Sequence, residues 1–367
     1  MATTAARGLM INGRFLGRQA TGVDRFAFET VRAIDQLLQS GDPLVAGLNA
    51  QIVVPRALGA LNNPFARIPL RAVGNGHGMR WEQLSLPHAA HGSLLLNLCN
   101  SGPLFFRQQV TVLHDAAPVR VPDSYSRAFS TWYRVMAPRL GRVARRVLTV
   151  SEFSRRELCD AYRIPRAKIG VVPESGEHML RVPDAGAGSY GATAQRPYVL
   201  AVGSLNRHKN FKLVSDAAKL LGDAAFDIVV VGGGDPRVYG TSHEPLPSLI
   251  KHLGYVNDAD LNALYRHAAC FVYPSRYEGF GLPPVEALAL GCPVIASRLP
   301  AVVEACGDAV LYVSPDDPRE LAGLLERITT DAALRDTLRA KGNAITAQLT
   351  WRATAVKLLE EISPWLT

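Results

Sequence analysis

The chain has 367 residues, 48% of them hydrophobic, which exceeds the usual size of one hydrophobic core and predicts two folded domains. Its formal net charge is +8, yet residues 1–180 contain 22 basic and 12 acidic side chains, whereas the remainder contains 18 and 20. Five cysteines form no C-x-x-C pair, which argues against a disulfide or zinc framework and favours reduced thiols.

The sequence predicts neither a secretion signal nor a membrane span. The N-terminal segment M-A-T-T-A-A-R-G-L-M lacks a long apolar core. No later segment reaches about 18 uninterrupted apolar residues, the length that a membrane-spanning helix needs. We therefore expect a cytoplasmic protein.

The first predicted elements are an amphipathic helix and a set of buried strands. The helix begins near Gly22, in the segment T-G-V-D-R-F, and its apolar residues recur at helical spacing. Short apolar runs then alternate with helical patterns, which is typical of parallel strands joined by crossover helices. The predicted strands of this first set are 51–54, 94–96, 110–113 and 147–150.

A histidine follows the third of these strands. His114 and Asp115 come directly after residues 110–113, at a strand end where a side chain can reach a ligand. A neutral imidazole can donate or accept a hydrogen bond near physiological pH. A lone histidine is otherwise more often structural, so the residues alone leave both interpretations open.

An arginine cluster follows in the same half of the chain, beside Tyr125, Trp132 and Tyr133. Such a surface could meet anionic lipid headgroups or a lipid-diphosphate acceptor at the inner face of a membrane. A solvated helix face is the alternative interpretation. Nucleic acid is not expected as a partner, because no recognised reading motif accompanies the charge. The clustered arginines are Arg134, Arg139, Arg142, Arg145 and Arg146.

A second set of strands predicts a second domain. Residues 182–197 are short of bulky apolar side chains, so we expect the interdomain linker there. The two domains are predicted to be doubly wound α/β folds that face each other across a cleft. The strands of the second set are 198–202, 226–231, 269–273, 294–296 and 310–312.

A basic loop follows the first strand of the second set. The strand ends at Gly203, and S-L-N-R-H-K-N comes next. Ligands bind at the carboxyl ends of strands in open α/β sheets. Arg207 and Lys209 could therefore meet an anion, and exposed loop cations are the alternative.

The segment after strand 269–273 combines a glycine loop, a helix start and two carboxylates. Gly279 and Gly281 let the main chain approach a ligand closely, and a helix from about Gly281 to Leu290 offers the positive end of its dipole to a diphosphate. Glu278 lies in the loop and Glu286 in the helix. The alternative is structural, since Ser275 and Glu278 fit a capping box.

Glu278 and Glu286 resemble the E-x(7)-E signature of the retaining family 4 glycosyltransferases. The flanking residues G-F-G and G-C-P-V-I also follow the family's pattern. The resemblance implies that Glu278 lies near the donor sugar and that Glu286 binds the nucleotide ribose.

The resemblance also implies roles elsewhere in the chain. Lys209 would neutralise the departing diphosphate, and His114 would hydrogen-bond the sugar or the acceptor. Many members carry arginine directly after the glycine, where this chain has Ser204, so Arg207 is the candidate substitute. The predicted catalytic residues are thus His114, Lys209 and Glu278. The predicted donor-binding residues are Gly22, Gly203, Ser204, Arg207, Lys209, Tyr255, Val256, Gly279, Phe280, Gly281, Leu282 and Glu286.

The fold implied is GT-B, with two Rossmann-like domains at residues 1–180 and 181–348 and a last helix, 349–367, that crosses back to the first domain. The donor would be a nucleotide diphosphate sugar, with GDP-mannose favoured, and the acceptor a glycan or lipid-linked glycan in polysaccharide assembly. No metal is expected, because the textual D-x-D at Asp258 and Asp260 fits helix capping better. The alternatives are a sugar-nucleotide epimerase and a non-catalytic GT-B scaffold subunit.

Overall fold

The structure, a computed structural model, describes residues 7–18, 21–59, 61–183, 190, 194–203, 206–232 and 247–366. The chain packs as two units: residues up to Glu174 together with those from Trp351 onward form unit 1, and Ser175–Thr350 form unit 2. The boundary between the two units, at Ser175, precedes residues 182–197, where the sequence predicted the interdomain linker. Ser175 Oγ donates a hydrogen bond to Leu349 O at 2.5 Å, and the short 3-10 helix η7 (Glu177–Arg181) packs within unit 2.

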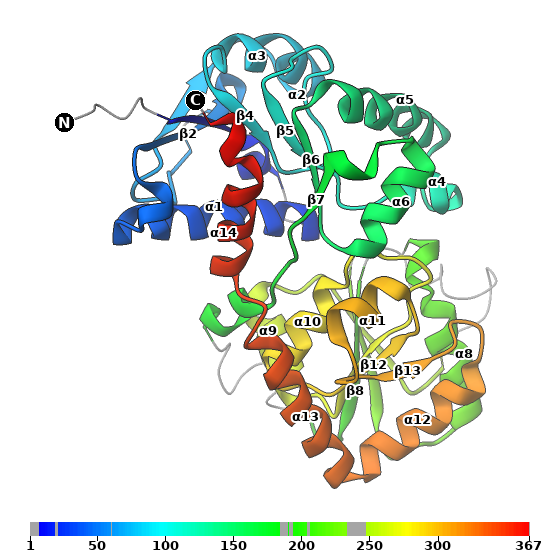
Figure 1. The fold of residues 1–367 in the computed structure, drawn as a ribbon. Helices are drawn as coiled ribbons and strands as arrows, with labels where there is room; N and C mark the ends of the chain where they lie inside the picture. The colour runs from blue at the N-terminus through cyan, green and yellow to red at the C-terminus, as the bar shows by residue number, and fades with distance from the viewer. Residues whose placement is uncertain are drawn as a thin grey trace. The chain divides into compact units, whose positions relative to one another are not determined.

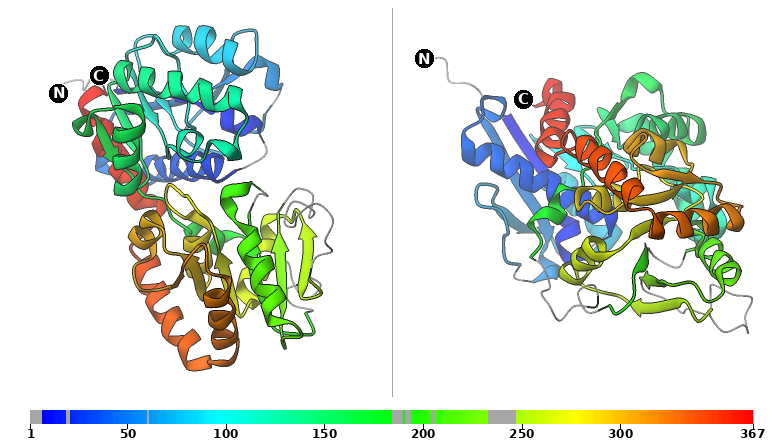
Figure 2. Two further views of the ribbon diagram at one scale, coloured as in Figure 1. Left: turned by 90° about the vertical axis from the view of Figure 1, so that its right-hand side faces the viewer. Right: turned by 90° about the horizontal axis from the view of Figure 1, so that it is seen from below.

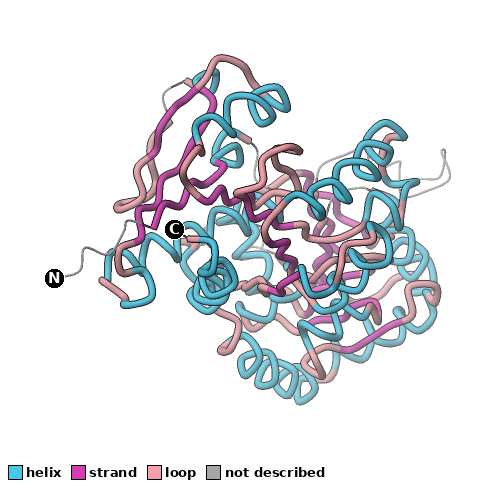
Figure 3. The backbone as a smooth tube through the Cα atoms, turned by 45° about the horizontal axis from the view of Figure 1, so that its top comes forward, coloured by secondary structure: helices cyan, strands magenta, loops and turns pink. Residues whose placement is uncertain are grey.

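The described strands of unit 1 form a parallel sheet in the order β3-β2-β1-β4-β5-β6-β7. Strands β4 and β5 are buried along their whole length, as expected for central strands covered on both faces. Figure 3 shows the strands of each unit side by side. The bounds are β1 Arg7–Asn12, β2 Leu48–Pro55, β3 Leu70–Val73, β4 Leu94–Asn97, β5 Gln109–Val112, β6 Arg146–Thr149 and β7 Ile169–Val171.

The helices of unit 1 include the predicted amphipathic helix, α1. Thr21 caps it, and the Asp24 carboxylate accepts a hydrogen bond from the Thr21 backbone N–H at 3.2 Å, which is a capping box. The last helix, α14, lies alongside α1 (Figure 1), and the Phe26 and Trp351 rings meet edge to face. The bounds are α1 Gly22–Ser40, α2 Gly78–Arg80, α3 Leu86–Ala89, α4 Ala117–Arg120, α5 Arg127–Val143, α6 Glu152–Tyr162 and α14 Trp351–Ile362.

The described strands of unit 2 form a second parallel sheet, in the order β10-β9-β8-β11-β12-β13. The central strands are nearly all buried, and side chains of α8 and α12 join the same apolar core. Figure 2 shows α8 and α12 side by side. The strand bounds are β8 Tyr198–Val202, β9 Asp227–Val231, β10 Ile250–Gly254, β11 Cys270–Tyr273, β12 Val294–Ser297 and β13 Leu311–Val313. The helix bounds are α8 Phe211–Leu221, α9 Asp258–His267, α10 Leu282–Ala289, α11 Pro300–Cys306, α12 Pro318–Thr330 and α13 Ala332–Thr346.

The predicted α/β class with two doubly wound sheets is confirmed. All nine predicted strands are present, whereas β1, β3, β7 and β10 were not expected from the sequence. Strands β3 and β10 are partly exposed and carry polar side chains, and β7 has three residues, so none of them contains a long apolar run. Among the described helices, none has both the length and the apolar content that a bilayer span requires.

Candidate functional site

The donor-binding candidates of unit 2 lie at the point where its strand order reverses. Strands β8 and β11 are neighbours, but the chain leaves β8 toward β9 and leaves β11 toward β12. At such a switch point the two following loops diverge and leave a crevice for a ligand. Gly203 and the short 3-10 helix η8 (Arg207–Lys209) follow β8, and residues 274–281 follow β11.

Asn210 joins these two loops. It has a left-handed backbone conformation, with φ of 54°, which asparagine tolerates better than most residues. Its buried side-chain amide donates to Pro274 O at 3.0 Å and to Pro315 O at 2.8 Å. The Arg276 N–H donates to His208 O at 2.7 Å. The loop after β8 is therefore held against the loop after β11.

This junction brings Lys209 to Glu278. Lys209 Nζ lies 2.8 Å from Glu278 Oε1 and 5.5 Å from the centroid of the Tyr273 ring. The two side chains are 19% and 14% exposed, so a ligand can still reach them. The structure thus brings together two of the residues that the sequence predicted as catalytic.

The pair changes the acidity of Glu278. Burial is the largest single effect and raises the pKa of the Glu278 carboxyl, but the charge and hydrogen bond of Lys209, together with the Ser275 and Tyr273 hydroxyls, outweigh it, and the pKa lies below its ordinary value. Glu278 is therefore a carboxylate at neutral pH. It can accept hydrogen bonds from sugar hydroxyls and is unsuited to act as a general acid.

The glycine loop delivers the chain to the start of α10. Gly281 has φ of 111°, a conformation that strains any residue with a Cβ, and an added Cβ would lie 3.3 Å from Val302 Cγ2. Phe280 and Leu282 are buried, so their backbones rather than their side chains are available to a ligand. Prolines occupy the second and third positions of α10. Its first turn therefore offers an anion fewer N–H donors than an ordinary helix start would.

Glu286 is held by a histidine that the sequence analysis did not select. His178 Nε2, from η7, lies 3.0 Å from Glu286 Oε1, and both side chains are largely buried. His178 therefore orients the Glu286 carboxylate from the side of η7. Burial, followed by the nearby Glu286 carboxylate, raises the pKa of Tyr265 well above its ordinary value, so the phenol stays neutral.

Gly176 permits this contact. A Cβ at Gly176 would lie 2.4 Å from Val285 O, closer than a carbon and an oxygen can approach. We expect Gly176→Ala to reduce the free energy of unfolding by about 1–3 kcal/mol, since backbone must shift to admit the methyl group. Urea denaturation would measure the loss.

Gly323→Ala is the matched control for that substitution. Gly323 lies inside α12, and an added Cβ would find no atom within 4 Å. Because alanine favours helices over glycine, this variant should be neutral or up to about 1 kcal/mol more stable. Equal destabilisation by both substitutions would contradict the packing argument.

The other donor-binding candidates of unit 2 are spread along the same sheet edge. Arg207 is exposed and makes no ion pair with any described residue. Tyr255 is 67% exposed and Val256 half-buried, after the edge strand β10, roughly 10 Å across the sheet from β8 by strand spacing. The Gly203 N–H donates to Val231 O at 3.0 Å. Ser204 lies outside the described residues.

The predicted residues of unit 1 are His114 and Gly22. Gly22 is the first residue of α1, after the Thr21 cap. His114 is 4% exposed, and both ring nitrogens have partners within unit 1: Nδ1 lies 3.2 Å from Glu174 Oε1 and Nε2 lies 3.0 Å from Leu98 O. A sugar hydroxyl could bind to the ring only by displacing one of them.

His114 is more basic than an ordinary histidine. Burial lowers its pKa, but the hydrogen bond and charge of Glu174 and the Leu98 carbonyl together raise it by more, and the pKa lies above its ordinary value of 6.5. Both partners are acceptors, so a doubly protonated ring satisfies both. The His114 ring therefore stays protonated to a higher pH than an ordinary histidine does.

The D-x-D segment forms the first turn of α9, and Asn257 caps that helix. Asn257 Oδ1 accepts a hydrogen bond from the Asp260 N–H at 2.9 Å, and Asp258 lies in the first turn of α9. Within the part of the chain that the structure describes, no group of three histidine, cysteine or acidic side chains is arranged to hold a metal ion.

Four residues of these networks were missed: Glu174, Gly176, His178 and Asn210. The first three lie in the short segment P-E-S-G-E-H-M-L, which follows β7. Polar residues at the end of a strand were a usable signal there. Asn210 directly follows Lys209, and its role could be inferred only once Pro274 and Pro315 were known to lie beside it.

Comparison with known sequences gives two family matches. Residues 188–344 match "Glycosyl transferases group 1", and residues 24–174 match "Glycosyltransferase Family 4". O-antigen chain mannosyltransferase B of Escherichia coli is 30% identical over 68% of this chain and 70% of that protein. O-antigen chain mannosyltransferase RfbU of Salmonella typhimurium is 31% identical over 62% of each chain.

Comparison with solved structures covers nearly the whole chain. Sucrose-phosphate synthase from Thermosynechococcus elongatus has a TM-score of 0.70 at 20% identity, over 97% of this chain and 98% of that one. Anabaena Alr3699/HepE, solved with UDP and glucose, has a TM-score of 0.68 at 16% identity, over 98% and 99%. At these identities the likeness concerns the fold alone.

Proposed function

The chain belongs to glycosyltransferase family 4, and on that premise we propose that it transfers a mannosyl group from GDP-mannose to a glycan or lipid-linked glycan acceptor, with retention of anomeric configuration. Its fold is the expected GT-B pair of Rossmann-like domains. The observation that carries the proposal is the Lys209–Glu278 pair at the β8/β11 switch point. The names of the two O-antigen mannosyltransferases support mannose as the sugar.

The donor would lie along the carboxyl edge of the unit 2 sheet. Lys209 would face the diphosphate, because it is a cation held at the switch point beside Glu278. Glu286 would accept hydrogen bonds from the ribose, and Glu278 would accept them from the sugar. The backbone from Gly279 to Leu282 would approach the phosphates, and Tyr255 and Val256 would lie toward the base.

In the proposed reaction the bond between the anomeric carbon and the diphosphate oxygen breaks, and the acceptor hydroxyl forms a new bond to that carbon on the same face. The hydroxyl proton passes to an oxygen of the departing diphosphate. Lys209 stabilises the negative charge that this oxygen gains, which is the main electrostatic demand of the step. The proposal therefore needs no metal ion.

A thermal-shift screen of sugar nucleotides tests the donor. At a concentration of about 100 times its Kd, a ligand of the native state adds about 2.7 kcal/mol, which corresponds to a rise in Tm of roughly 5 °C or more for a domain of this size. We expect the rise with GDP-mannose. A rise with a UDP-sugar instead would overturn the choice of donor, and no rise with any sugar nucleotide would favour the non-catalytic scaffold.

Transfer to a glycan acceptor tests the reaction. The anomeric configuration of the product, measured by nuclear magnetic resonance, should match that of the donor. An inverted product would contradict retention, and release of an epimerised sugar without transfer would favour the epimerase.

The Glu286 contact makes a further prediction. Because His178 orients the carboxylate at 3.0 Å, His178→Ala should weaken donor binding about 10-fold, the value of a hydrogen bond of roughly 1.4 kcal/mol. Glu286→Gln should weaken it at least as much. Isothermal titration calorimetry measures both, with the exposed Glu326→Gln on α12 as the control. Unchanged affinity in both variants would exclude Glu286 from the donor site.

A further inference from the structure

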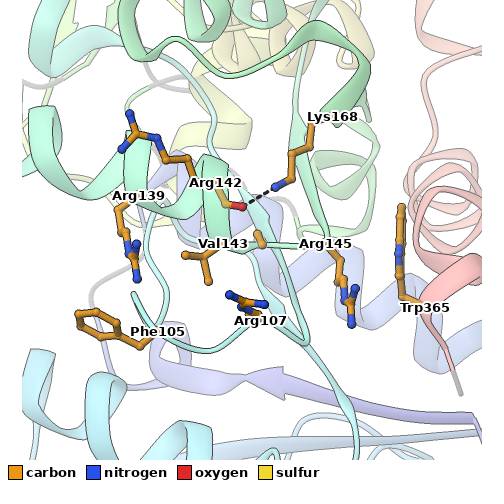
Figure 4. Close-up of a pocket in the computed structure, with 9 residues that line it drawn as sticks. Phe105, Arg107, Arg139, Arg142, Val143, Arg145, Lys168 and Trp365 are labelled. Carbon is orange, nitrogen blue, oxygen red and sulfur yellow. Dashed lines mark hydrogen bonds between the residues drawn. The ribbon is translucent and has the colours of Figure 1, made fainter.

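A basic pocket lies in unit 1, away from the residues discussed above. Its volume is about 470 Å³. Figure 4 shows arginine and lysine side chains around it, with the Phe105 ring at one side and the Trp365 ring at another. The lining residues are Phe105, Arg107, Arg139, Arg142, Val143, Ala144, Arg145, Lys168 and Trp365.

The topology of the sheet separates this pocket from His114. Phe105 and Arg107 precede β5, Arg145 precedes β6, and Lys168 precedes β7. They therefore lie at the amino ends of three parallel strands, whereas His114 follows the carboxyl end of β5. A strand of this length spans roughly 13 Å. The pocket is at the opposite edge of the sheet.

The positive charge of the pocket is uncompensated. Its lining contains five cationic side chains and no acidic one, and within the described part of the chain none of the five is in an ion pair. The neighbouring Arg146, by contrast, is neutralised by Glu361. Burial, followed by the charge of Arg145, lowers the pKa of Lys168. A bound anion would reduce the electrostatic repulsion among these five cations.

Several of these cations are already positioned. Arg139 Nε donates to Leu104 O at 3.0 Å, and the guanidinium lies 4.8 Å from the centroid of the Phe105 ring. Arg145 Nε donates to Gln108 Oε1 at 3.2 Å, and Lys168 Nζ donates to Arg142 O at 2.8 Å. The guanidinium groups of Arg139 and Arg145 are thus held through Nε, which leaves their terminal nitrogens available to an anion.

We propose that this pocket binds a phosphate-bearing anion, either the headgroup of an anionic lipid or a soluble diphosphate. Planar guanidinium groups match phosphate oxygens in pairs, and several together suit a group with more than one charge. Phe105 is 81% exposed at the rim, and an aromatic ring beside cations is suited to the boundary between headgroups and acyl chains. The site belongs to unit 1 and does not depend on the donor.

Vesicle flotation tests the headgroup source. The full chain should bind vesicles of phosphatidylcholine mixed with phosphatidylglycerol and not vesicles of phosphatidylcholine alone. Each cation near such a surface contributes about 5-fold in affinity, so the double variant Arg142→Gln with Arg145→Gln should bind about 25-fold more weakly. Both substituted side chains, Arg142 and Arg145, are exposed, so the double variant should still fold. An unchanged Tm would verify that.

The matched control removes two arginines of α5, the helix that carries Arg142. Arg127→Gln with Arg134→Gln has the same net charge, and both residues are exposed on α5 outside the pocket. If the pocket and not the overall positive charge binds the headgroups, the affinity of this control variant for the vesicles should stay within about 2-fold of the parent's. An equal loss in both double variants would overturn the proposal.

Calorimetry with inorganic pyrophosphate tests the soluble source. The measurement is made in a Lys209→Met background, so that the candidate donor site does not contribute. Pyrophosphate that binds and competes with vesicles assigns a lipid headgroup to the pocket. Pyrophosphate binding that depends on Arg142 and Arg145, without vesicle binding, assigns a soluble diphosphate. Binding of neither probe would overturn the proposal.

Discussion

Replacing Lys209 by methionine is expected to lower kcat for sugar transfer by about 100- to 1,000-fold, the usual effect of removing one group that stabilises charge in the transition state. Methionine keeps most of the length of the side chain and removes the ammonium beside Glu278. The charge on the departing diphosphate would then lose the cation that lies beside Glu278 at the switch point. Steady-state kinetics with the donor identified by the thermal-shift screen would measure the change.

Lys212→Met is the matched control for Lys209→Met. Lys212 is 68% exposed on α8 and pairs with Asp216, so it shares the local charge but lies on a solvated face. Its kcat should stay within about 2-fold of the parent, as expected for an exposed ion pair. Equal losses in the two variants, or none in either, would remove Lys209 from the reaction.

Replacing Glu174 by glutamine is expected to destabilise the protein in a pH-dependent way. The carboxylate raises the pKa of His114 above 6.5, so its contribution is complete below the unfolded pKa and is lost as pH rises through the higher folded pKa. The free energy of unfolding should fall by about 2 kcal/mol at pH 5.5 to 6, the range for a hydrogen bond to a charged group. The loss should shrink as pH rises above 6.5.

Urea denaturation across this pH range measures the effect. His91→Gln is the control, because His91 is exposed and its replacement should leave the pH dependence unchanged. His114→Gln should reduce the pH dependence as Glu174→Gln does, since each removes one member of the same pair. A loss that is constant across the range would contradict an ionic His114–Glu174 pair.

The sequence was sufficient for most of the central strands, although β1, which lies between β2 and β4, was not expected. Residues 110–113 and 294–296 are mostly apolar, as expected for strands covered by helices on both faces. The edge strands escaped prediction because β3 and β10 are partly exposed. Their place in the sheet is determined by hydrogen bonds to β2 and β9, which no local pattern records.

The sequence also predicted which residues of unit 2 carry chemistry. Glu278 and Glu286 were selected by their resemblance to the E-x(7)-E signature, and Lys209 by its place after a strand together with the same resemblance. Their local surroundings follow from chain order, because loops that leave adjacent parallel strands meet at one sheet edge.

Only the tertiary structure decided the partners of these residues. Lys209 meets Glu278 because Asn210 fastens one loop to the other, and His178 meets Glu286 because Gly176 lets η7 pack on α10. The pKa of His114 is raised by Glu174, which lies 60 positions along the chain. Hydrogen bonds and charge effects act over a few ångströms in space, so their direction depends on distant segments that only the folded chain brings together.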